Sequence, residues 1–68
     1  MTVINYVKKG PEGENVYGGI LLSDSPEIAK KEMHDAIIES RDAVFTTPDE
    51  RKIKFNPKVL ILWNVSET

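Results

Sequence analysis

Alternating apolar and polar residues predict five strands in this chain, and a segment of helical periodicity separates the second strand from the third. The strand patterns, which are rich in β-branched and aromatic side chains, cover residues 3–7, 16–22, 44–47, 52–55 and 58–65. The helix is predicted to begin after Ser23-Asp24-Ser25, because a Ser or Asp N-cap followed by a proline is a common start signal. It is expected to end near residue 40 or 41, with Ala29, Met33, Ala36 and Ile37 on its core-facing side.

The resulting order, β-β-α-β-β-β, predicts an α+β fold in which one helix packs on one face of a small, mainly antiparallel sheet. A length of 68 residues, without repeats or low-complexity stretches, predicts a single compact domain over residues 1–68. The first two strands should form a hairpin joined by residues 8–15, a polar connection that is either a binding tip or an ordinary turn. Gly18 and Gly19 predict a bulge, or the close approach of a bulky neighbour such as Trp63.

The last strand has apolar side chains on both of its faces. Val59, Ile61, Trp63 and Val65 share one face by alternation, whereas Leu60 and Leu62 point to the opposite one. One helix can cover only one face, so we expect a second copy of the chain to cover the other by two-fold symmetry. This homodimer would place Leu60, Leu62 and Trp63 in its interface. The alternative is that the N-terminal hairpin folds across that face.

Composition excludes several classes of function. The apolar share of 40% and the charged share of 29% are ordinary for a folded protein, and a net charge of −2 gives no general attraction to nucleic acid or anionic lipid. The chain has no cysteine, one histidine (His34), and neither a P-loop nor a dinucleotide-binding glycine motif. We therefore expect no metal, no cofactor, no catalytic residues and no enzymatic activity. A small enzyme with His34 or carboxylates at a dimer seam remains a minor alternative.

Neither a membrane-spanning segment nor a secretory signal is expected. The longest apolar run covers only residues 59–63, and the first residues lack a basic region followed by an apolar one. These patterns predict a cytoplasmic protein that does not bind membranes. Short α+β chains without cysteine are common among bacterial and bacteriophage proteins, which suggests such an origin.

Charges on the predicted helix are separated between its two flanks. Glu32, Asp35 and Glu39 form one acidic stripe at spacings of three and four residues, where like charges repel mildly. Such a stripe, with Ile38 exposed on the polar side of the helix, is expected to bind a positively charged partner. The alternative is a solvated flank in which Lys31 pairs with Asp35. The opposite flank is expected to carry Lys30, His34 and Arg41.

A basic stretch offers a second kind of surface. Arg51, Lys52, Lys54 and Lys58 surround Ile53 and Phe55, and lysines beside an aromatic residue on a strand are typical of platforms that bind single-stranded nucleic acid. Alternation points Phe55 inward with Ile53, however, and exposed lysines also protect sheet edges against aggregation. Lys8 and Lys9 would enlarge this patch if the first strand lay beside it.

The most favoured function from these patterns is a non-enzymatic protein-binding module, acting as a homodimeric regulator or inhibitor of a larger macromolecule, such as a nucleic-acid-processing one. Its partners would be a second copy of itself and an unidentified protein. The alternative is a nucleic-acid-binding sheet that uses the basic residues of 51–58.

Overall fold

The computed structural model describes all 68 residues and contains five strands, one α-helix and one short 3-10 helix. In chain order these are β1 (Thr2–Lys9), β2 (Asn15–Leu22), α1 (Pro26–Glu39), β3 (Ala43–Thr46), β4 (Lys52–Phe55), η1 (Pro57–Val59) and β5 (Leu60–Glu67). This order and the antiparallel pairing of all strands confirm the predicted α+β fold. The short helix η1 was not predicted: Asn56 caps it by accepting the Lys58 backbone N–H at 2.9 Å.

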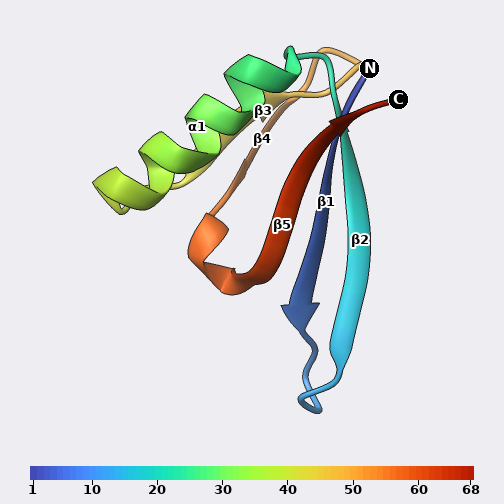
Figure 1. The fold of residues 1–68 in the computed structure, drawn as a ribbon, viewed down its shortest axis with the longest axis vertical. Coiled ribbons are helices and arrows are strands. Elements are labelled where there is room, and N and C mark those ends of the chain that lie inside the picture. The colour runs from blue at the N-terminus through green and yellow to red at the C-terminus, as the bar shows by residue number, and fades with distance from the viewer.

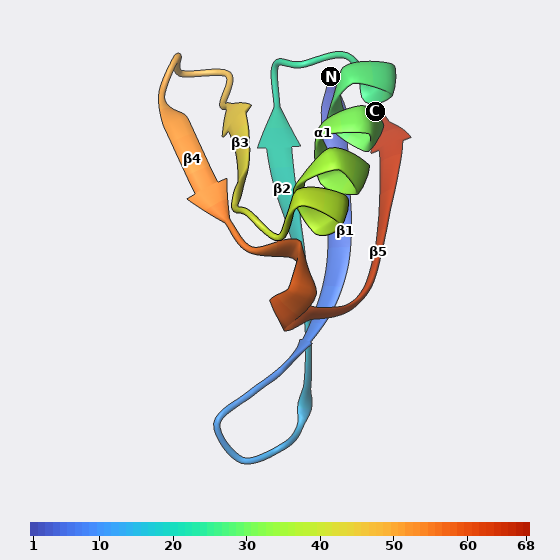
Figure 2. The same cartoon turned by 90° about the vertical axis from the view of Figure 1, so that its left-hand side faces the viewer.

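The strands form two sheets that meet at one end. β2, β1 and β5 make a three-stranded sheet with β1 in the centre, and β3 and β4 make a separate hairpin. The Ser23 N–H, just after β2, donates to the Thr46 carbonyl at 2.9 Å and joins the two sheets. Figure 2 shows the ends of β2 and β3 next to each other at this junction. From there the three-stranded sheet diverges from α1 and the β3–β4 hairpin, so that the fold opens toward the far end (Figure 1).

A small core fills the space between α1 and the two sheets. Its buried members are Ile4, Leu22, Ala29, Met33, Ala36, Ala43 and Phe45. The predicted core face of the helix is thus confirmed for Ala29, Met33 and Ala36. Only 9 of the 68 residues are buried. Because the core is so small, burying the apolar surface that remains exposed would add a large share to the stability of the fold.

Local signals set the two ends of α1. Ser25 is the N-cap, and its hydroxyl accepts the Ile28 backbone N–H at 3.3 Å. The helix ends at Glu39 because Ser40 adopts a left-handed conformation (φ 53°) and its N–H turns back to the carbonyls of Ala36 and Ile37. Arg41 therefore lies beyond the helix, so its predicted position on the flank opposite the acidic residues is wrong.

The N-terminal hairpin is part of the three-stranded sheet. β1 pairs with β2 along its whole length, from Thr2–Leu22 to Lys9–Asn15, and with β5 on its other side. The hairpin therefore does not fold across the second face of the sheet, and the alternative cover for that face is excluded.

A β-bulge changes which residues of β5 share a face. Val7 pairs with Leu62 but the next residue of β1, Lys8, pairs with Leu60, which leaves Ile61 as an extra residue. Leu60 is therefore shifted to the core side, where it packs against the buried cluster, while Leu62 remains on the opposite side. The prediction that Leu60 and Leu62 share a face is wrong, because strict alternation does not survive the bulge.

Gly18 makes room for an aromatic ring, although the ring is not the one predicted. A Cβ atom on Gly18 would overlap Cζ and Oη of Tyr6, its cross-strand partner. The ring of Tyr6 thus lies over Gly18. Trp63 instead packs against the core and toward His34 on α1, with ring centroids 5.4 Å apart.

Candidate protein-binding surfaces

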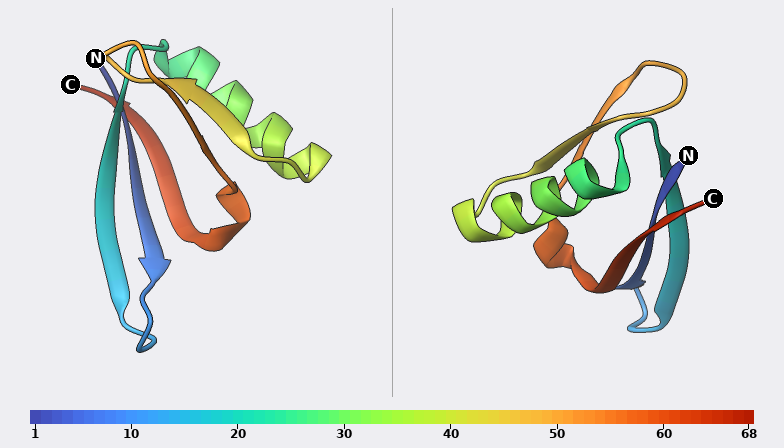
Figure 3. Two further views of the ribbon diagram at one scale, coloured as in Figure 1. Left: turned by 180° about the vertical axis from the view of Figure 1, so that it is seen from behind. Right: turned by 45° about the horizontal axis from the view of Figure 1, so that its top comes forward.

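One side of the three-stranded sheet is covered by no other element of the chain. Figures 1 and 3 show α1 and the β3–β4 hairpin on the opposite side. We call this uncovered side the outer face. By strand register it consists of Val3, Asn5 and Val7 of β1, Tyr17, Gly19 and Leu21 of β2, and Leu62, Asn64 and Ser66 of β5.

Apolar side chains cross the outer face in a row. Tyr17, Val7 and Leu62 are direct cross-strand neighbours, and Tyr17 and Leu62 are 73% and 65% exposed. Leu21, in another row, is 50% exposed. Large apolar side chains that are exposed together on one face are typical of an interaction surface.

A polar cluster lies beside this row. The Asn5 side-chain amide donates to Asn64 Oδ1 at 2.9 Å and to Ser66 Oγ at 3.1 Å. Together with Tyr17 and Leu62, Asn5 and Asn64 line a shallow hollow of about 480 Å³. The outer face thus combines apolar contact area with side-chain amides that can orient a partner.

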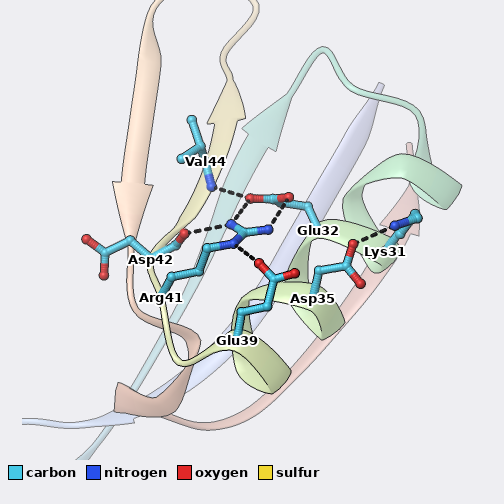
Figure 4. A network of polar contacts seen from close by, with 7 residues as sticks. All are labelled: Lys31, Glu32, Asp35, Glu39, Arg41, Asp42 and Val44. Atoms are coloured by element: carbon cyan, nitrogen blue, oxygen red, sulfur yellow. Dashed lines mark hydrogen bonds and ion pairs between the residues drawn. The ribbon is translucent and has the colours of Figure 1, made fainter.

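The acidic stripe of α1 is paired within the chain. Figure 4 shows the Arg41 guanidinium between two carboxylates: it donates to Glu32 at 2.7 and 3.2 Å and to Glu39 at 2.6 Å. Lys31 binds Asp35 at 2.5 Å, the pair expected for a solvated flank. Every carboxylate of the stripe therefore has a cation beside it, which weakens its attraction for a basic partner.

These contacts shift the ionisation of the groups involved. The hydrogen bonds from Arg41 lower the pKa of Glu32 below its ordinary value; partial burial opposes this shift, and the Val44 backbone N–H adds to it. The hydrogen bond to Asp35 and its negative charge raise the pKa of Lys31. Glu32 and Lys31 thus stay charged over a wider pH range than they do in the unfolded chain.

Two carboxylates have a structural role that the sequence did not reveal. Glu32 Oε2 accepts the Val44 N–H and Asp24 Oδ2 accepts the Thr46 N–H, both at 2.9 Å. These side chains satisfy backbone donors of β3 that pair with no strand. No sequence signal distinguishes them from other acidic residues. A partner-binding role for Glu32, Asp35 and Glu39 stays a prediction, as does one for Ile38, which is 79% exposed.

The basic stretch does not gather its four cations at one place. Arg51 pairs with Asp49 in the turn before β4, and Lys58 Nζ donates to Ser40 Oγ at the end of the helix. Lys52 and Lys54 point to solvent from β4, while Ile53 and Phe55 pack against the core as the alternation predicted. The arrangement resembles a protected edge strand more than a continuous phosphate-binding track.

Of the three residues predicted for the dimer interface, Leu62 alone lies on the outer face. Leu60 and Trp63 pack against the chain's own core from the other side of the sheet. Tyr17, which sequence reasoning did not single out, is the most exposed apolar residue of the outer face. In the sequence, only the alternation of side chains along β2 could have assigned Tyr17 to this face.

Comparisons of the chain with models of protein families, with curated proteins and with solved structures find no match. The structure has no helix of the length and apolar character that crossing a membrane requires. A functional assignment therefore rests on the chain's own surfaces.

Proposed function

We propose that this protein is a small non-enzymatic protein-binding module that associates with a second copy of itself through the outer face. One observation carries the proposal: the outer face exposes Tyr17, Leu21 and Leu62, and no element of the chain covers it. Burying this apolar area would give a chain with a small core additional stability.

The size of the outer face limits the strength of this association. Three strands of eight residues form a surface of roughly 26 by 14 Å, or about 360 Å² in projection. This is about half of the roughly 800 Å² per partner that a standard interface buries. We therefore expect a dimer that dissociates in the micromolar range, with the two sheets packed face to face.

A homodimer of this kind would leave α1 and the β3–β4 hairpin free for another partner. We propose that the protein acts by binding, as a small regulator or inhibitor of a larger macromolecule. The paired acidic stripe gives little support to docking by charge alone. Because self-association occupies the outer face, recognition of this partner would depend on contacts made by α1 or the hairpin, where Ile38 is an exposed apolar residue.

The substitution Leu62→Lys tests the proposal, because it places a charge within the proposed interface. The side chain is 65% exposed, so the folded monomer should tolerate the change. Sedimentation equilibrium should show a dimer for the wild type and a monomer for Leu62→Lys. Ile28→Lys is the matched control: Ile28 is 59% exposed but lies on α1, and this variant should remain dimeric. Equal self-association of Leu62→Lys and the wild type would disprove the proposed interface.

A further inference from the structure

A second apolar surface lies on the opposite side of the sheet from the outer face. It is a groove of about 340 Å³ between the three-stranded sheet on one side and β4 and η1 on the other. Apolar side chains from both sides line it, among them Ile20, Ile53, Phe55 and Leu60, and Lys8 and Lys54 complete the lining.

The groove exists because the core is not closed at this end. Here the three-stranded sheet diverges from β4, as Figure 1 and the left panel of Figure 3 show. Ile20, Ile53, Phe55 and Leu60 pack against the buried cluster but remain only partly buried. Val59, also in the lining, is 62% exposed. An apolar side chain from a partner could therefore extend the core into this space.

The charges beside the groove have one sign. The lysine side chains that find a partner in the chain are Lys9, Lys31, Lys52 and Lys58. The side chains of Lys8 and Lys54 make no hydrogen bond and belong to none of the ion pairs. No acidic side chain lines the groove. The unpaired positive charges complement a partner with carboxylates on both sides of an apolar anchor.

We infer that this groove binds an acidic peptide segment of a partner protein, with a large apolar side chain in the groove and flanking carboxylates near Lys8 and Lys54. A peptide fits better than single-stranded nucleic acid, which needs aromatic faces free for stacking. Here Phe55 stacks on Phe45 with centroids 5.6 Å apart, and the Tyr6 ring lies over Gly18. The inference goes beyond the proposed self-association, because it uses the other side of the sheet.

The probe is a fluorescein-labelled peptide in which Leu-Phe stands between two pairs of Glu, titrated with the full chain by fluorescence anisotropy. The double variant Lys8→Glu/Lys54→Glu should bind it about tenfold more weakly, because two attractive contacts become repulsive. Lys30→Glu is the control: Lys30 is an exposed helix residue outside the groove, and its variant should bind like the wild type. Equal affinity of the double variant and Lys30→Glu would overturn the inference.

A second pair of variants tests the apolar part. Val59→Asp places a carboxylate in the groove and should weaken peptide binding at least as much as the double variant Lys8→Glu/Lys54→Glu does. Ile28→Asp is the control: Ile28 is similarly exposed but lies in the first turn of α1, and this variant should bind the peptide like the wild type. A labelled oligothymidine that binds as tightly as the peptide would assign the groove to nucleic acid and overturn the inference. Circular dichroism checks folding, and sedimentation of the same variants separates loss of peptide binding from loss of self-association.

Discussion

Replacing Glu32 with alanine should destabilise the fold, because this carboxylate joins three parts of the chain. It lies on α1, accepts two hydrogen bonds from Arg41 after the helix, and accepts the Val44 N–H of β3. Its side chain is only 22% exposed, so these bonds are partly shielded from water. The substitution removes all three bonds and leaves the guanidinium with Glu39 and the Asp42 backbone carbonyl.

The expected cost follows from the number of bonds and their partial exposure. A hydrogen bond to a charged group contributes about 1.5–3 kcal/mol when buried, and an exposed ion pair about 0.2–1 kcal/mol. Since Arg41 and Val44 can recruit water once Glu32 is lost, we expect Glu32→Ala to reduce the free energy of unfolding by about 1–2 kcal/mol. For a domain of this size that corresponds to a fall in Tm of roughly 4–16 °C.

Urea unfolding monitored by circular dichroism at several pH values measures this cost. Because folding lowers the pKa of Glu32 from its ordinary value of 4.5, its contribution is complete above that pH and is lost as the pH falls through the folded-state pKa. The difference in unfolding free energy between the wild type and Glu32→Ala should therefore be constant from pH 5 to 7. It should shrink below pH 4.5.

Glu39→Ala is the matched control for this prediction. Glu39 also binds Arg41, but through one contact and with a side chain that is 58% exposed, and its negative charge lies in the unfavourable last turn of the helix. Its loss should change the unfolding free energy by less than about 0.5 kcal/mol. If Glu32→Ala costs no more than Glu39→Ala, or if its cost is independent of pH, the structural role assigned to Glu32 is wrong.

Three further substitutions test local features of the fold. Gly18→Ala should displace the Tyr6 ring and change tyrosine fluorescence. Gly19→Ala should not, because its Cβ would meet its nearest neighbour at 3.5 Å. Identical fluorescence spectra for Gly18→Ala and the wild type would refute the close approach of Tyr6 to Gly18. Glu50→Gly should raise the unfolding free energy by about 0.5–1 kcal/mol, since Glu50 has φ 65° in the turn before β4, and a loss of stability in urea would contradict this. Ser25→Ala should lower the free energy of unfolding by about 1 kcal/mol, because the helix loses its N-cap. An unchanged Tm would contradict the role of Ser25 as the cap.

Features coded by neighbouring residues could be predicted from the sequence. The start of α1 at Ser25-Pro26 depends on a side-chain cap and a fixed φ angle, both local. The inward direction of Ile53 and Phe55 follows from alternation in a short strand without a bulge. The end of α1 was placed one or two residues late, because its left-handed residue is Ser40 and not the glycine that usually marks this position.

Features set by pairing between distant segments could not be predicted. The extra residue Ile61 depends on the register between β1 and β5, and it reverses the side on which Leu60 lies. The ion pair between Arg41 and Glu32 forms only because the helix ends at Glu39 and the chain turns back at Ser40. For the candidate sites, the sequence placed Leu62 on an uncovered face, but it could not show that Lys8 and Lys54 meet at one groove.

The central claim is that the outer face is the surface through which two copies associate. The most direct measurement is a dilution series of ¹H–¹⁵N NMR spectra across the micromolar range. The account predicts that the amide signals of Val7, Tyr17 and Leu62 move together with concentration while those of the exposed side of α1 stay fixed. Signals that do not change with concentration, or changes confined to α1, would contradict it.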